Sequence, residues 1–171
     1  MTQIAAIIGG GVIGGGWAAR FLLNGWDVRV FDPDPEAKRK IGEVLDNARR
    51  SLPGLYEAPL PDEGALSFHT SIPDAVAGAI WIQESVPEQL DLKQKIYVSL
   101  QEHCSKLAII GSSTSGFKPS ELQQGARRPE QIMVCHPFNP VYLLPLIEVV
   151  PSKKSDLKIV ERAENLLRTL G

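Results

Sequence analysis

A glycine-rich stretch, IIGGGVIGGGWAARF at residues 7–21, constrains the fold more than any other part of the sequence. Gly9, Gly11 and Gly14 fit the G-x-G-x-x-G spacing of a dinucleotide-binding turn between a strand and a helix. The first glycine allows a tight turn, the second lets the backbone approach a pyrophosphate, and the third lets the helix pack closely on the strand. A glycine-rich turn without a ligand is the alternative interpretation.

An acidic residue favours the dinucleotide interpretation. A second predicted strand, Asp27–Phe31, is followed directly by Asp32, so strand, glycines, helix, strand and acid follow one another in the order of the nucleotide-binding unit. A carboxylate at this position can accept hydrogen bonds from both hydroxyl groups of the adenosine ribose, and it repels a 2′-phosphate. We therefore predict that Gly9, Gly11, Gly14 and Asp32 bind NAD rather than NADP.

The alternation of apolar runs with helical patterns predicts the fold class. This pattern is typical of βαβ units around a parallel sheet, so we predict an α/β, Rossmann-type doubly wound, mostly parallel sheet with helices on both faces, in one domain over residues 1–171. The predicted strands are Ile4–Ile8, Asp27–Phe31, Leu66–His69, Ala79–Gln83, Leu107–Ile110 and Gln131–Cys135. The predicted helices are Gly14–Asn24, Asp34–Arg50, Glu88–His103 and Lys154–Leu170, and the proline-rich segment Ser51–Gly64 is predicted to be a loop.

Composition argues against several other classes of protein. A net charge of -2 gives no field that attracts nucleic acid or an anionic membrane. The uncharged stretch Ile4–Ala19 is too rich in glycine for a spanning helix and follows no basic residue. Cys104 and Cys135 form neither a disulfide framework nor a metal-binding pattern with the histidines, so we expect no metal and a reduced, cytoplasmic setting.

Two polar motifs follow strands in the second half of the chain, GSSTSGF at 111–117 and CHPFNPVYLLPLIEVV at 135–150. Open α/β sheets bind ligands at the carboxyl ends of their strands. Together with the glycine stretch and VPEQLDLK at 86–93, these motifs resemble the NAD-binding domain of the 3-hydroxyacyl-CoA dehydrogenase family, from Ile4 to about Gly171. The resemblance implies NAD as cofactor and oxidation of a secondary alcohol, with a further strand carrying Glu148.

The resemblance also implies roles for four residues. His136 is expected to be the catalytic base with Glu148 as its carboxylate partner, Ser115 to hydrogen-bond the reacting oxygen, and Asn139 to lie near the nicotinamide and the substrate. An imidazole, with an ordinary pKa of about 6.5, suits the removal of a hydroxyl proton at neutral pH. Cys135 could suggest a thiolate pair with His136, but neighbouring strand residues point to opposite faces, so we predict that Cys135 belongs to the core.

Glu88 and Lys93 match residues that contact the cofactor around the nicotinamide ribose in the family. Each has a second interpretation. Glu88 could be an acid in the first turn of a helix that Pro87 opens, and Lys93 could be an exposed helix residue.

Two departures from the acyl-CoA members indicate a smaller substrate. The basic helical excursion that helps to hold coenzyme A in those members is replaced by Ser51–Gly64, and Ser113 stands where they usually have Asn. The motifs are most similar to members that oxidise a small free 3-hydroxy acid, L-carnitine foremost, with L-gulonate or a 3-hydroxyacyl-CoA as alternatives. Tyr142 could contact a quaternary ammonium or be an ordinary packing aromatic. A non-catalytic, crystallin-like NAD-binding module is the alternative of another class.

Members of the family continue into a helical domain that supplies a second active-site asparagine, much of the substrate pocket and the dimer interface. We therefore expect the 171-residue chain alone to bind NAD and to turn over substrate poorly or not at all. The expected partner is a small hydroxy acid, not nucleic acid or a membrane, and the full-length form is expected to be a homodimer.

Overall fold

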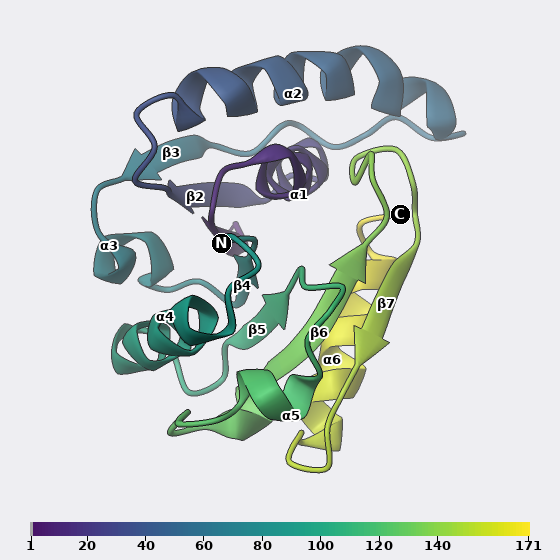
Figure 1. Ribbon diagram of the computed structural model, residues 1–171. Helices are drawn as coiled ribbons and strands as arrows, with labels where there is room; N and C mark the ends of the chain where they lie inside the picture. Colours follow the sequence, from purple (N-terminus) through teal and green to yellow (C-terminus); the bar gives the residue numbers. More distant parts are fainter. Residues whose placement is uncertain (1) are drawn as a thin grey trace.

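The computed structural model describes residues 2–171, which form a seven-stranded sheet with helices on both faces (Figure 1). The strand order is β3-β2-β1-β4-β5-β6-β7, in which β1 to β6 run parallel and β7 runs antiparallel to β6. The predicted doubly wound α/β class is therefore confirmed. The strands are β1 (Ile4–Ile8), β2 (Asp27–Phe31), β3 (Leu66–His69), β4 (Trp81–Glu84), β5 (Ile109–Ser112), β6 (Ile132–Pro137) and β7 (Ile147–Val150).

The helices divide between the two faces of the sheet because successive strand residues point to opposite sides. Ile7 belongs to the hydrophobic cluster that α1, α2 and α6 cover, and Ile8 belongs to the cluster under α3, α4 and α5. The helices are α1 (Val12–Leu23), α2 (Ala37–Ser51), α3 (Ile72–Val76), α4 (Leu90–His103), α5 (Pro119–Leu122) and α6 (Leu157–Arg168), with 3-10 turns at Leu52–Leu55 and Pro129–Gln131. No helix within residues 2–171 is long and apolar enough to cross a membrane.

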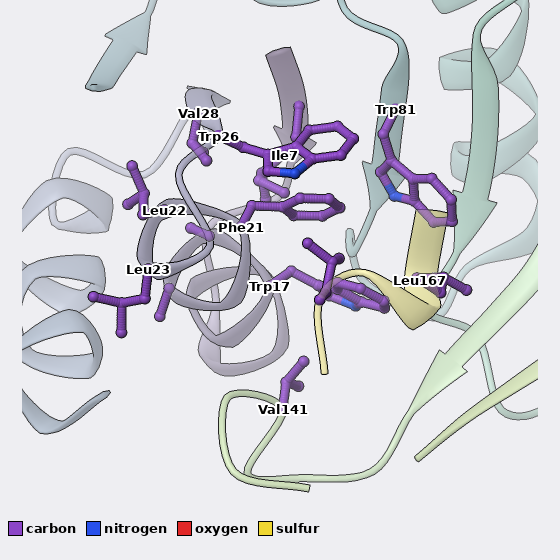
Figure 2. Close-up of a cluster of buried hydrophobic side chains, with 14 of the residues drawn as sticks. Ile7, Trp17, Phe21, Leu22, Leu23, Trp26, Val28, Trp81, Val141 and Leu167 are labelled. Carbon is purple, nitrogen blue, oxygen red and sulfur yellow. The ribbon is translucent and has the colours of Figure 1, made fainter. Parts of the chain in front are cut away.

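Helix α1 is held in place by an aromatic cluster on its face of the sheet (Figure 2). Trp17 stacks on Phe21 with ring centroids 5.7 Å apart, and Phe21 lies 5.0 Å from Trp26 and 6.0 Å from Trp81 of β4. Such pairs contribute about 0.5–1.5 kcal/mol each beyond the burial of their area. The cluster therefore fixes α1, and with it the start of the helix at Gly11, against the centre of the sheet.

Several strands begin and end at residues other than those predicted. Strands β1, β2 and β3 have the predicted bounds, whereas β4, β5 and β6 begin and end later than predicted. The register of β4 begins at Trp81 and that of β5 at Ile109, so the apolar residues Ile80 and Leu107, which are 36% and 69% exposed, lie before the paired parts of their strands. Pairing with neighbouring strands, not hydrophobicity alone, decides where a strand begins.

Two short helices were not predicted. Helices α3 and α5 are too short to show a 3.6-residue periodicity, although Pro73 and Pro119 stand in their first turns. The predicted loop Ser51–Gly64 is largely confirmed, since Ser51 ends α2 and only the 3-10 turn Leu52–Leu55 interrupts the segment.

Candidate functional site

The sheet has its topological switch point between β1 and β4, where the chain turns to β2 on one side and to β5 on the other. Open α/β sheets bind ligands in the crevice at this point, beyond the carboxyl ends of the strands. A cavity of about 860 Å³ lies here. It is lined by the loops after β1 (Gly9, Gly10, Gly11), β2 (Asp32, Pro33, Asp34) and β4 (Ser85, Val86, Pro87), and by Phe31, Lys40, Ile72, Leu92 and Ile96.

Gly9 and Gly14 are required by the backbone around the turn. Gly9 has φ +96°, and a Cβ there would lie 2.6 Å from the carbonyl oxygen of Ser85. A Cβ on Gly14 would lie 1.8 Å from the carbonyl oxygen of Gly9, so any side chain would force α1 away from β1. The structure thus brings the turn and the helix as close together as the fingerprint requires.

Gly11 differs from these two because its side of the backbone is open. A Cβ on Gly11 would meet no atom within 4 Å, and Gly11 is the N-cap residue of α1 without a capping side chain. The first N–H groups of a helix lack intrahelical partners, and the helix dipole favours an anion beside them. This open cradle fits the pyrophosphate of a dinucleotide.

Asp32 lies at the end of β2 and faces the same cavity. Its two carboxylate oxygens accept hydrogen bonds from the backbone N–H groups of Gly10, at 2.5 Å, and Asp34, at 2.7 Å. Because a carboxylate oxygen has two acceptor sites, Asp32 retains the capacity to bind ribose hydroxyls. The structure adds a role that sequence reasoning missed, since Asp32 also fastens the glycine turn.

A second carboxylate at this end of the cavity, that of Asp34, is paired with a lysine. Lys40 donates to Oδ2 of Asp34 at 2.6 Å. Hydrogen bonds from Lys40 and from the N–H group of Glu36 hold the pKa of Asp34 below its ordinary value. Of these two carboxylates, Asp34 has a lysine partner, and among the described residues no salt bridge to Asp32 occurs.

A smaller pocket of about 250 Å³ lies against β6 and β7, beside the loop that follows β5 and the start of α5. Ser115, His136 and Glu148 line it together with Thr114, Gly116, Phe117, Lys118, Pro119, Val134 and Val150. The structure therefore gathers three of the four residues for which the sequence predicted catalytic roles.

His136 and Glu148 are cross-strand neighbours on β6 and β7. Nδ1 of His136 lies 2.9 Å from Oε2 of Glu148, and the two side chains are 24% and 57% exposed. With a proton on Nδ1 donated to the carboxylate, Nε2 keeps a lone pair that can accept a proton. Phe138, which the sequence did not single out, packs edge-on to the His136 ring with centroids 5.4 Å apart.

The neighbouring residues have different positions. Asn139 is exposed on the loop that follows β6. Cys135 is fully buried in the cluster under α1 and α6, which confirms its prediction as a core residue, and burial raises the pKa of its thiol far above the ordinary range. Tyr142 packs against the same cluster, so its position is that of a packing aromatic.

Glu88 and Lys93 lie between the two pockets and contact each other. Nζ of Lys93 is 3.2 Å from Oε2 of Glu88, but the Lys93 side chain is only 1% exposed whereas that of Glu88 is 45% exposed. The alternative that Lys93 is an exposed helix residue is therefore wrong. Partial burial acts to raise the pKa of Glu88, but the hydrogen bond from Thr114 and the charge of Lys93 outweigh it and lower the pKa.

Sequence reasoning also missed a buried carboxylate at the end of β4. Glu84 is fully buried and pairs with Lys93, whose Nζ lies 2.6 Å from its Oε1. The signal was present in WIQE, because an acid inside an apolar strand has to find a buried partner. No group of three or more potential metal ligands of the His, Cys, Asp and Glu types occurs in the described part of the chain.

Comparison with known proteins gives a consistent result. Residues 4–171 match the family described as 3-hydroxyacyl-CoA dehydrogenase, NAD binding domain, which confirms the predicted cofactor. A Ruegeria pomeroyi protein named L-carnitine dehydrogenase/betainyl-CoA thioesterase is 73% identical over 167 residues, covering 98% of this chain and 34% of the relative. An L-carnitine dehydrogenase of Mesorhizobium japonicum is 51% identical over 168 residues, covering 98% of this chain and 46% of the relative.

Solved structures agree with the fold. The structure of 3-hydroxybutyryl-CoA dehydrogenase from Escherichia coli K12 superposes with a TM-score of 0.86 at 26% identity, covering all of this chain and 37% of that one. An NAD⁺-dependent 5-formyl-3-hydroxy-2-methylpyridine 4-carboxylic acid 5-dehydrogenase gives a TM-score of 0.89 at 32% identity, with 100% and 56% coverage. The chain thus spans about a third to a half of the length of these relatives.

Proposed function

This chain belongs to the 3-hydroxyacyl-CoA dehydrogenase family, and on that premise we propose that it carries the NAD site and the catalytic base of an enzyme that oxidises the 3-hydroxyl group of a small hydroxy acid, L-carnitine foremost. One observation carries this proposal. The contact of 2.9 Å between His136 on β6 and Glu148 on β7 lies in the same pocket as Ser115, which stands on the loop after β5.

His136 acts as the general base. Oxidation of a secondary alcohol removes a hydride and a hydroxyl proton, and bound NAD supplies the hydride acceptor. Nε2 of His136 takes the proton, while Glu148 holds Nδ1 and stabilises the imidazolium that forms. The pairing of β6 with β7 sets this geometry, because His136 and Glu148 face each other across the ladder.

Ser115 and Asn139 complete the polar surroundings of the reacting carbon. The Ser115 hydroxyl can donate to the oxygen both as an alcohol and as a carbonyl, which orients the substrate for proton transfer to His136. Asn139, exposed on the loop after β6, offers an amide to the substrate or the nicotinamide. The role of Ser115 is supported by the family resemblance and by its place in the lining of the pocket, and that of Asn139 by the resemblance and its position three residues after His136.

On the cofactor side, the open face at Gly11 and the first N–H groups of α1 hold the pyrophosphate. Asp32 would accept hydrogen bonds from the adenosine ribose, and Glu88 would contact the nicotinamide ribose. Gly9 and Gly14 make the turn possible rather than binding the cofactor themselves.

The choice of substrate draws on relatives that are named for L-carnitine and are 51–73% identical to this chain. The short loop after α2 is consistent with a small substrate, because it contains no helix beyond the 3-10 turn Leu52–Leu55. The helical domain beyond residue 171, the homodimer and the cytoplasmic setting, all expected from the sequence, remain predictions.

A chimera tests the proposal. This chain would replace the 167-residue segment that it matches in the Ruegeria pomeroyi relative, and the absorbance of NADH would be followed with L-carnitine, L-gulonate and 3-hydroxybutyryl-CoA. We expect turnover of L-carnitine by the chimera and little or none by the 171-residue chain alone. Tight NAD binding without oxidation of any of the three alcohols would instead favour a non-catalytic module, and preference for the acyl-CoA would contradict the substrate assignment.

A further inference from the structure

A buried cluster of charged and polar side chains lies directly beneath the loops that line both pockets. Its centre is the carboxylate of Glu84, both oxygens of which accept hydrogen bonds. Oε1 accepts from the Val86 N–H group at 2.9 Å and from Lys93 at 2.6 Å. Oε2 accepts from the hydroxyl groups of Tyr97, at 2.5 Å, and Ser112, at 2.6 Å. A buried carboxylate needs such partners to remain stable. Glu84 therefore joins β4, α4 and β5 at the floor of the site.

Lys93 has no hydrogen-bond donor left for a ligand. An ammonium group has three N–H donors, and three protein oxygens surround this one: Oε1 of Glu84 at 2.6 Å, Oε2 of Glu88 at 3.2 Å and the carbonyl of Val86 at 3.3 Å. With its side chain 1% exposed, the Lys93 ammonium is beneath the surface that a cofactor could touch.

Glu88 connects this buried network with the surface of the site. Its Oε2 pairs with Lys93, while its Oε1 accepts hydrogen bonds from the Thr114 hydroxyl and, at 3.4 Å, from the Gly116 N–H group. The Thr114 hydroxyl oxygen in turn accepts from the N–H groups of Gly116, at 3.2 Å, and Phe117, at 3.1 Å. The turn that presents Ser115 is therefore fastened to the carboxylate of Glu88.

We propose that Lys93 is a positioning residue that acts on NAD through Glu88, with Glu84 as its buried anchor, rather than a residue that touches the cofactor. The inference rests on the proposed contact between Glu88 and the nicotinamide ribose. The same ion pair holds Glu88 against Thr114, so it aligns the cofactor contact with the serine that faces the reacting oxygen.

A double-mutant cycle on NAD affinity tests this inference in the 171-residue chain, without any need for turnover. The variants are Glu88→Gln, Lys93→Met and the pair together, each measured by titration with NAD after circular dichroism has shown that it is folded. We expect Glu88→Gln to raise the Kd for NAD about 10-fold and Lys93→Met to raise it by no more than that. The Kd of the double variant should equal that of Glu88→Gln within about twofold. The control is Lys95→Met, the same change at an exposed position of α4, which should leave the Kd unchanged.

Two outcomes would overturn the inference, and they are distinguishable. Losses that multiply in the double variant, to about 100-fold for two 10-fold effects, would mean that Lys93 contacts NAD directly, while the proposed function would stand. An unchanged Kd for Glu88→Gln would remove the proposed Glu88 contact itself, and the inference with it. If Lys93→Met does not fold because Glu84 loses its partner, Glu84→Gln combined with Lys93→Met removes both buried charges and takes its place in the cycle.

Discussion

Replacing Gly11 by alanine separates cofactor binding from folding more cleanly than any other single change at the glycine turn. The backbone of Gly11 has φ −67° and ψ −166°, which alanine adopts without strain, and its Cβ would meet no protein atom within 4 Å. Alanine is a poorer N-cap than glycine by up to about 1 kcal/mol, and it gains about 0.4–1 kcal/mol from the lower entropy of the unfolded chain. The free energy of unfolding should therefore change by less than about 1 kcal/mol.

The effect on NAD should be much larger. The new methyl group would project into the open cradle at the start of α1, where the pyrophosphate is expected to approach the backbone. Losing one charge-assisted hydrogen bond costs about 1.5–3 kcal/mol, which corresponds to a rise in Kd of about 10- to 100-fold. Isothermal titration with NAD and urea denaturation of the same preparation would measure the two quantities side by side.

Two other glycines provide the controls. Gly42, inside α2, also has open space around its Cβ position, so Gly42→Ala should raise the free energy of unfolding by about 0.5–1 kcal/mol and leave the Kd for NAD unchanged. Gly14→Ala should instead destabilise the fold by about 1–3 kcal/mol or more, because its Cβ would lie 1.8 Å from the carbonyl oxygen of Gly9. Unchanged NAD affinity in a folded Gly11→Ala variant would refute the reasoning.

Two further substitutions and one labelling experiment test other parts of the structure. Asp32→Ala should lower the ratio of NAD affinity to NADP affinity by about 10-fold or more, because the carboxylate that repels a 2′-phosphate is lost. An unchanged ratio would contradict the role of Asp32. In the chimera, His136→Gln should lower kcat by about 10²-fold or more and leave NAD affinity within about twofold, whereas equal loss of both would indicate a structural residue. Burial raises the pKa of the Cys135 thiol, so a smaller fraction of this thiol is ionised at any given pH. Iodoacetamide at about pH 8 should therefore label Cys135 only after unfolding. Rapid labelling of the folded chain would mean that Cys135 is accessible.

The central part of the fold was readable from the sequence because local signals and tertiary packing agree there. Strand β1 is an apolar run followed by the glycine turn, and β2 alternates buried with partly exposed residues and is followed by Asp32; both have the predicted bounds. The contact between His136 and Glu148 was expected from the family resemblance, and the structure supplies its physical basis, because the pairing of β6 with β7 places the two residues opposite each other.

Other features depend on contacts that no local pattern encodes. Lys93 occurs in a helix with polar neighbours, and its burial depends on oxygens outside that helix, those of Glu84, Val86 and Glu88. The hydrogen bond from the Gly10 N–H group to Asp32 gives that carboxylate a second role, fastening the glycine turn, which the sequence does not reveal. The late start of β4 likewise follows from its register with β1 and β5, not from its own apolar run.

A crystal structure of this chain with NAD would test the central claim most directly. The account predicts the pyrophosphate on the first N–H groups of α1 beside Gly11, the adenosine ribose on Asp32, and the nicotinamide ring facing the pocket that contains Ser115 and His136. A dinucleotide bound outside the crevice between β1 and β4, or a nicotinamide ring turned away from His136 in an otherwise unchanged fold, would contradict it.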